Sequence, residues 1–308
     1  MTTQKIDAAY LEREVTLFDP TKFWNLYPAL KGRKLFPLNQ KIRGKGFDKY
    51  EYKLYDHKGL SKLVNAKSKD IPKLNITAEN FTGHVRVAKI GNEWTQEDVE
   101  AADFAASNGG APNTLLSDTF EKCSQANDLL EDQILWLGDS ENNLYGLTNH
   151  PNVSETVVAN GASSSPLWSS KTTAEIVSDF ADVISSVLVE TKELFEANAV
   201  FLPLSAHATL HQMHSDYQAK TVMAVLRETY PQIKVWEFVG KLETAGTGGT
   251  RCMYALALDP RVITAVCPYE NEFTKVYESL EGYKVAVRKG VGGVKVDFPL
   301  AIQGAYGF

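Results

Sequence analysis

Charge is distributed very unevenly along this chain of 308 residues, and this constrains what it folds into. Residues 31–73 hold 13 Lys and Arg against 4 Asp and Glu, a local net charge of +9. Residues 93–141 hold 12 acids and one base, Lys122, for a local net charge of −11. Single-sign segments of this size repel themselves and require a surface of opposite sign. The chain carries both segments, so it supplies its own complement.

The basic segment is predicted to form an extended hairpin. Residues 50–54 alternate with the period of a strand, and Gly44, Gly46 and Gly59 mark turns. Aromatic residues are interleaved with the lysines, and three interpretations stay open. The segment is a nucleic-acid platform that holds phosphates and stacks bases, a solvated hairpin, or an arm laid across the acidic surface of another copy. Opposite patches on one sequence favour the third interpretation.

The composition is that of an ordinary globular chain. Hydrophobic residues make up 44% and charged residues 23%, which excludes a largely disordered chain, a collagen-like repeat and a disulfide scaffold. The three cysteines, Cys123, Cys252 and Cys267, are far apart and indicate reduced thiols. No apolar run approaches the ~18 residues that span a bilayer, and the N-terminus lacks a signal-peptide core. We therefore expect no membrane contact and no export.

Two consecutive helices are predicted over about 94–137. Thr95 and Asp98 have the spacing of a capping box, residues 108–112 interrupt the helix, and Gly138 ends the second one. The second helix carries one apolar stripe, predicted to be buried with the acids on the other faces. The stripe consists of Leu116, Phe120, Cys123, Ala126, Leu130, Ile134 and Leu137. The pair would make a spine of about 60 Å if nearly straight.

The rest of the chain mixes helices and strands, which predicts an α+β fold with one lobe inserted into another. The inserted lobe is a small layered α/β unit at about 145–260. We expect helices at about 173–197 and around Val222–Leu226, and strands at 81–90, 199–204, 233–239, 253–258, 262–267, 284–287 and 294–298.

No residue pattern builds a convincing active site, so an enzyme is not expected and neither is a cofactor. His207, His211 and His214 lie at i, i+4 and i+7 and could ligate zinc from one helical face. The glutamate of a His-Glu-x-x-His protease is absent, and exposed histidines on a polar helix explain the pattern equally well. Glu131 and Asp132 are adjacent and point to different helix faces, so they are not an acid/base pair.

Two stretches of sequence resemble a known family. One is 138–153, which contains Gly138, Asn149 and Pro151, and the other is the ending 292–308. With the order of elements from about residue 36 onward, they resemble the major capsid proteins of tailed bacteriophages, which share their fold with encapsulins. Thr148 departs from that pattern, which has an apolar residue before the asparagine.

The resemblance implies a tailed-phage capsid fold with four parts. These are an N-terminal arm at 1–35, an extended β-hairpin loop at 36–80, a peripheral domain at 81–144 and 261–308 with its spine helix at about 94–137, and an axial α/β domain at 145–260.

The implied function is a structural shell protein that self-assembles, as pentamers and hexamers, into the icosahedral head around the phage genome. In such shells the loop of one subunit lies over the peripheral domain of the next, which would bring the +9 and −11 segments together. The residues expected at this contact are Lys41, Arg43, Lys45, Lys49, Lys53, Glu97, Asp98, Glu121 and Asp128.

The implied partners are a separate scaffolding protein, a portal, possible decoration proteins and packaged double-stranded DNA held without sequence-specific contact. The protein would assemble in the host cytoplasm and reside in the virion. Two alternatives remain open at this point. The first is an encapsulin-type compartment enclosing an enzyme cargo, and the second is a soluble metal-dependent hydrolase that uses His207, His211 and His214.

Overall fold

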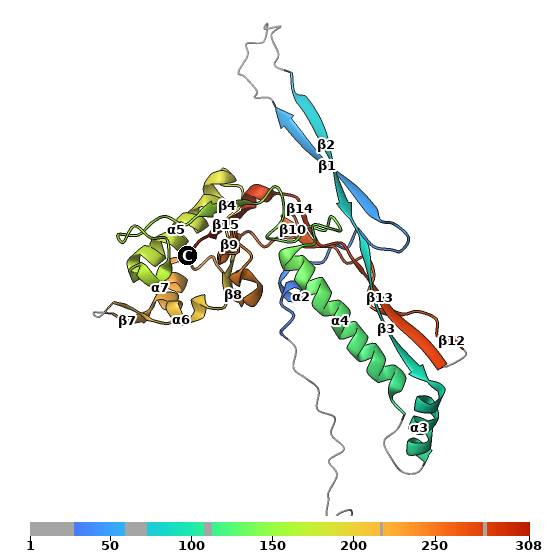
Figure 1. Cartoon of the computed structure of the whole chain (residues 1–308). Coiled ribbons are helices and arrows are strands. Elements are labelled where there is room, and N and C mark those ends of the chain that lie inside the picture. The colour runs from blue at the N-terminus through green and yellow to red at the C-terminus, as the bar shows by residue number, and fades with distance from the viewer. Residues whose placement is uncertain (1–27, 59–72, 108–112, 216–217, 280–281) are drawn as a thin grey trace, which may run out of the picture.

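The computed structural model describes residues 28–58, 73–107, 113–215, 218–279 and 282–308 (Figure 1). The predicted mixture of helices and strands is confirmed. The α-helices are α2 (Gly32–Leu35), α3 (Gln96–Ser107), α4 (Leu115–Leu137), α5 (Thr173–Glu190), α6 (Ala206–Leu210) and α7 (Val222–Thr229). Short 3-10 helices are η1 (Trp168–Ser170), η2 (Gly240–Glu243) and η3 (Pro299–Ala301).

Within the described residues, the strands form two larger sheets and three two-stranded pairs. They are β1 (Lys49–Lys58), β2 (Asn75–His84), β3 (Arg86–Thr95), β4 (Ser154–Val157), β5 (Ala199–Pro203), β6 (Met213–Ser215), β7 (Gln218–Thr221), β8 (Val235–Val239), β9 (Cys252–Leu256), β10 (Ile263–Ala265), β11 (Glu272–Phe273), β12 (Tyr277–Ser279), β13 (Gly282–Val291), β14 (Val294–Val296) and β15 (Ile302–Tyr306).

One lobe of the molecule is built on a five-stranded sheet in the order β4-β15-β9-β5-β8. β5 and β8 run parallel with α6 and α7 between them in sequence, while β9 pairs antiparallel with β5 and β15. The strand–helix–strand pattern predicted between 199 and 239 is therefore present. The C-terminal strand β15 also belongs to this sheet, where it pairs with β4.

Both faces of the five-stranded sheet are covered, which explains its continuous apolar strands. In β5 every residue is buried, and alternate side chains enter two different cores. Val200 packs on the α5 side with Phe180. Phe201 packs on the other side, where the ring centroids of Phe201 and Trp136 are 5.1 Å apart and those of Trp136 and Phe36 are 5.0 Å apart. The C-terminal end of α4 is thus part of the core.

The other lobe consists of α4 packed along a long ribbon of β3 and β13 (Figure 1). Ten residue pairs join these antiparallel strands, and β11 and β12 pair with the other edge of β13. Ala88, Ile134, Leu144 and Val291 form the small apolar core between helix and ribbon.

The conformation of the turn after α4 explains why residues 138–153 have a glycine at 138 and an asparagine at 149. Gly138 ends the helix at φ 71, and a Cβ there would lie 2.2 Å from the side chain of Asn149. Asn149 Oδ1 accepts a hydrogen bond of 2.7 Å from the Gly146 backbone N–H. The Thr148 hydroxyl donates to the carbonyl of Trp136 at 3.0 Å, so this departure from the family pattern caps the last turn of α4.

Two predicted helix starts are confirmed by their side-chain contacts. The backbone N–H of Asp98 donates to Thr95 Oγ1 at 3.2 Å, and the Thr95 N–H donates back to Asp98 Oδ2 at 3.0 Å. The start of α5 has the same reciprocal capping box between Thr172 and Glu175.

Two predicted boundaries are wrong. The strand expected at 81–90 is the junction of two strands, because β2 ends at His84 and β3, which begins at Arg86, pairs in a different sheet. The helix expected at 173–197 ends at Glu190, because Lys192 and Glu193 adopt positive φ.

The predicted straight spine of about 60 Å is also wrong. The side chain of Asn113 donates to Asp103 Oδ1 at 2.7 Å, which requires the chain to turn back after α3 rather than continue along its axis. α4 alone, with its 23 residues, is about 35 Å long.

Candidate subunit interface

The hairpin β1–β2 extends from the body of the molecule as a two-stranded antiparallel ribbon (Figure 1). The hairpin predicted within residues 36–80 is confirmed, with its second strand reaching His84. Residues 59–72, which carry three lysines of the basic segment, lie outside the described residues.

The inner half of the hairpin is anchored through an aromatic face. The rings of Tyr52 and Phe81 stack with centroids 5.5 Å apart, and Lys295 Nζ of β14 lies 4.2 Å from the Tyr52 ring centroid, a cation–π contact. Gly83 lies opposite Tyr50 and leaves room for its ring, because a Cβ there would approach the ring to 2.1 Å. Burial raises the pKa of both tyrosine hydroxyls, so they stay neutral.

The opposite face of the hairpin carries a small excess of positive charge. Lys49, Glu51, Lys53 and Tyr55 alternate with the anchored tyrosines along β1 and therefore point the other way. All four are exposed. Lys49 and Lys53, two of the predicted interface residues, thus point away from the aromatic face that is anchored to the body.

The three predicted interface residues before β1 lie in the loop that leads into it. Lys45 forms an ion pair with Glu272 of the same chain, and its Nζ lies 5.6 Å from the Tyr269 ring centroid. Lys41 and Arg43 are exposed. The structure therefore engages Lys45 within the subunit and leaves the other two side chains at the surface.

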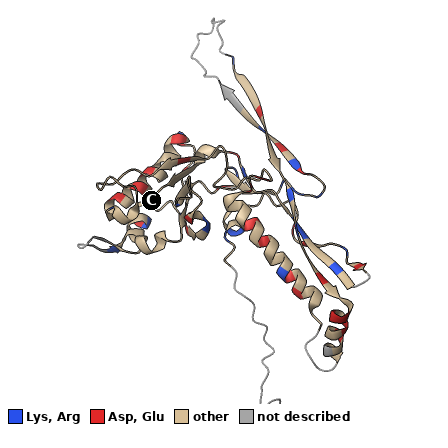
Figure 2. Ribbon diagram, viewed as in Figure 1, with Lys and Arg blue, Asp and Glu red and all other residues tan. Residues whose placement is uncertain are grey.

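Acidic residues gather along α3, as the red ribbon of Figure 2 shows, and the helix sequence contains no Lys or Arg. Glu97 and Glu100 are exposed. Asp98 is exposed too, but its hydrogen bonds with the N–H and hydroxyl of Thr95 lower its pKa and assign it to the helix cap. On α4, Glu121 is exposed and pairs with its neighbour Lys122 at 3.0 Å.

Two acids in the C-terminal half of α4 are buried, which contradicts the predicted arrangement. Glu131 and Asp132 are buried, whereas Leu116 and Leu130 of the predicted stripe are exposed. The buried stripe of α4 runs instead through polar positions. It contains Thr119, Cys123, Asn127, Glu131 and Ile134. The reason is a fully buried lysine on the ribbon, Lys289, which requires acidic partners.

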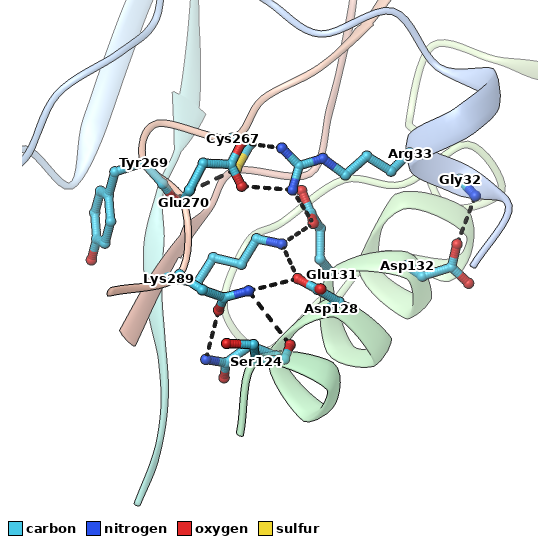
Figure 3. Close-up of polar contacts among 12 residues, drawn as sticks. Gly32, Arg33, Ser124, Asp128, Glu131, Asp132, Cys267, Tyr269, Glu270 and Lys289 are labelled. Atoms are coloured by element: carbon cyan, nitrogen blue, oxygen red, sulfur yellow. Dashed lines mark hydrogen bonds and ion pairs between the residues drawn. The ribbon is translucent and has the colours of Figure 1, made fainter. Parts of the chain in front are cut away.

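Figure 3 shows the ion-pair partners of this buried lysine. The ammonium of Lys289 pairs with Asp128 and Glu131, and Arg33 of α2 reaches Glu131 at 3.4 Å and Glu270 at 2.7 Å. Burial alone would lower the pKa of Lys289, but the two carboxylates outweigh it and raise that pKa. The hydrogen bond from Arg33 lowers the pKa of Glu270. Asp128, a predicted interface residue, therefore has a partner inside its own subunit.

The neighbouring Asp132 serves a different contact. Its Oδ1 accepts the backbone N–H of Gly32 at 2.6 Å, and its Oδ2 pairs with Lys241 of η2. The prediction that Glu131 and Asp132 point apart is confirmed. Together these contacts hold α2 and the two lobes against the end of α4 (Figure 3).

One sequence signal could have located the buried lysine. Val285, Val287, Lys289 and Val291 share one face of β13, and all four are buried. A lysine among apolar residues on the buried face of a strand implies a buried acid on the element that packs against that face.

The three histidines do not share a helical face. α6 is only five residues long, so His207 lies in it, His211 follows its end and His214 lies on β6. The rings of His207 and His211 stack at 4.0 Å on the surface. In the described part of the chain, no three or more metal-ligating side chains gather. The shared helical face expected from their spacing is wrong.

Solved structures similar to this chain include capsids and a virus-like particle. The capsid of Myoviridae phage XM1 is 16% identical with a TM-score of 0.76, covering 96% of this chain and 98% of that one. The capsid of a native GTA particle is 10% identical with a TM-score of 0.64 over 99% of each chain. A virus-like particle from Pyrococcus furiosus is 12% identical with a TM-score of 0.53, covering 90% and 95%. The fold is that of shell-forming capsid proteins.

The sequence itself identifies the family. The family described as major capsid protein matches residues 59–306, and the chain belongs to it: it is a structural shell protein of the tailed-phage head. No curated protein matches the sequence. The encapsulin and metal-hydrolase alternatives are not favoured.

Within the described ranges, no helix has the length and apolar character needed to cross a bilayer.

Proposed function

We propose that the hairpin β1–β2 of each subunit lies over the acidic surface of α3 and the exposed side of α4 in the next subunit, as a lateral tie of the shell. The observation that carries this is a match between two exposed surfaces. Lys49 and Lys53 are exposed on the hairpin face opposite the anchored tyrosines, where they outnumber the single acid Glu51, and α3 carries Glu97 and Glu100 without any base.

Each such ion pair is weak, because exposed pairs contribute about 0.2–1 kcal/mol. Their role is to steer the encounter and set the register of the hairpin on its neighbour. A closed shell repeats the contact at every subunit, so small differences in each contact add up across the particle.

The two lobes have separate roles in this proposal. The five-stranded lobe is the axial domain, where subunits meet at the centres of pentamers and hexamers. The lobe of α4 and the β3–β13 ribbon is the peripheral domain. β15 lies in the axial sheet, which supports assigning the last strand to the axial domain although it follows residue 260.

We further propose a separate scaffolding protein, a portal and possible decoration proteins as partners, with assembly in the host cytoplasm. The packaged double-stranded DNA is held without sequence-specific contact. The net charge of −6 supports packing without strong adhesion to the wall.

Charge reversal tests the lateral tie. Lys49→Glu/Lys53→Glu is expected to reduce the yield of closed shells, measured by light scattering and electron microscopy. Adding Glu97→Lys/Glu100→Lys is expected to restore part of it. The control Lys192→Glu/Lys234→Glu makes the same change in charge on the axial lobe. Equal shell yields for the hairpin variant, the control and the unsubstituted protein would refute the proposal.

A further inference from the structure

The outer half of the hairpin carries apolar side chains that no described part of its own chain covers. Tyr55 is 66% exposed and Ile76 63% exposed. The register pairs Tyr55 with Ala78, so that Ile76, two residues from Ala78, lies on the same face as Tyr55 and Lys53. Two-stranded hairpins alone are marginally stable in water. This face therefore requires a cover.

An open apolar cavity lies where α3, the start of α4 and the β3–β13 ribbon meet. Its volume is about 530 Å³, and its apolar lining is Trp94, Val99, Leu115, Leu116, Val276 and Tyr283. Leu116 and Val276 are about half exposed, so side chains of the described chain leave the cavity unfilled.

The two surfaces match in charge as well as in polarity. Glu97, Asp98 and Glu100 are exposed on α3 beside Val99 of the cavity wall, while Lys53 lies beside Tyr55 on the hairpin. Figure 1 places the outer ends of β1 and β2 and the helix α3 at opposite ends of the molecule. A subunit therefore cannot fill its own cavity, and the matching hairpin belongs to a second copy. Such a head-to-tail contact between different surfaces forms a closed ring when its rotation closes, as a shell requires.

We propose that Tyr55 and Ile76 of one subunit fill the cavity at Leu116 of the next, and that this apolar contact supplies most of the affinity of the lateral tie. The inference rests on the proposed function, since it starts from a hairpin docked on a neighbour. Exposed ion pairs contribute little, whereas aromatic and aliphatic anchors in desolvated pockets dominate interface energetics. The lysines then set register and encounter rate.

Replacing the apolar anchors tests their contribution. Tyr55→Ser/Ile76→Ser is expected to weaken association at least about tenfold per contact, because two buried side chains are lost. The loss of shells should be the same at low and high salt, unlike that of the charge-reversal variant. The control Val189→Ser/Leu194→Ser removes two equally exposed apolar side chains from the end of α5 and should assemble normally. Shells at normal yield from the hairpin variant would overturn the inference.

Cross-linking tests which residues meet, independently of yield. Ile76→Cys combined with Leu116→Cys, treated as shells with a flexible bismaleimide, is expected to give ladders of linked subunits on a denaturing gel. Ile76→Cys with Val189→Cys is the control and should give monomer. The native cysteines, Cys123, Cys252 and Cys267, are buried and do not compete.

The results also separate the two proposals. If the ladders are absent and Tyr55→Ser/Ile76→Ser assembles normally while charge reversal at Lys49 and Lys53 still reduces shells, the apolar anchor is wrong and the lateral tie stands. If charge reversal is also harmless and no ladder forms, both proposals are wrong.

Discussion

Replacing the buried lysine of the ribbon is predicted to be among the most damaging single changes to this fold. Lys289 is fully buried, and its ammonium pairs with Asp128 and Glu131 of α4. Lys289→Met keeps most of the volume but leaves Glu131 buried, with the guanidinium of Arg33 at 3.4 Å as its remaining cation. Removing one partner of a buried ion pair costs about 3–5 kcal/mol. A typical domain is stable by only about 5–15 kcal/mol.

The measurement is urea unfolding of unassembled capsomers at a fixed protomer concentration, because assembly stabilises the folded state by mass action. Lys284→Met is the matched control. It makes the same substitution on the same strand, where Lys284 pairs with Glu93 at 2.9 Å in an exposed position, and it should cost at most about 1 kcal/mol.

A second variant separates the charge from the packing. In Lys289→Met/Glu131→Gln the uncompensated carboxylate is gone, so the double variant should be more stable than Lys289→Met alone. If Lys289→Met unfolds at the same urea concentration as Lys284→Met, or if the double variant is no more stable than the single one, ion pairing does not hold the ribbon to α4.

Two smaller predictions concern the C-terminal end of α4 and the Arg33–Glu270 ion pair. Thr148→Val removes the hydroxyl that donates to the Trp136 carbonyl at 3.0 Å and should cost about 1 kcal/mol in unfolding free energy; an unchanged urea midpoint would contradict the capping role. The pKa of Glu270 is lowered from its usual 4.5 by the hydrogen bond from Arg33, so its contribution is present above that pH and is lost as pH falls through the lowered pKa. Glu270→Gln should therefore be less stable than the unsubstituted protein at pH 7 and should lose less stability on acidification; parallel pH profiles would refute this.

Local patterns in the sequence predicted much of the fold. The capping pair Thr95–Asp98, the start of the helix at about 173 and the stop at Gly138 depend on contacts within a few residues, so spacing predicted them. The hairpin within the basic segment and the mixed α and β architecture follow from periodicity for the same reason.

The sequence predicted only part of the candidate interface. The basic and acidic segments predicted that copies of the chain attract one another. Composition does not show which charged side chains lie on the exposed face of a strand or helix and which are buried. The register of β1 and β2 assigns Lys49 and Lys53 to the outward face. Packing of α4 on β13 removes Asp128 from the exposed acids by pairing it with Lys289.

The histidines show the same limit. Their i, i+4, i+7 spacing predicts a shared face only if one helix contains all three, and α6 stops after five residues before the chain enters β6. Helix length depends on tertiary packing as well as on local propensity.

Segment charge, helix caps and strand periodicity are properties of neighbouring residues, and they were present in the sequence before any fold was known. Which acids are buried, which hairpin face is basic and where an open apolar cavity lies depend on residues more than a hundred positions apart, such as Asp128 and Lys289. Those contacts exist only after the chain has packed, because burial of one group determines which partner it needs and where that partner must come from.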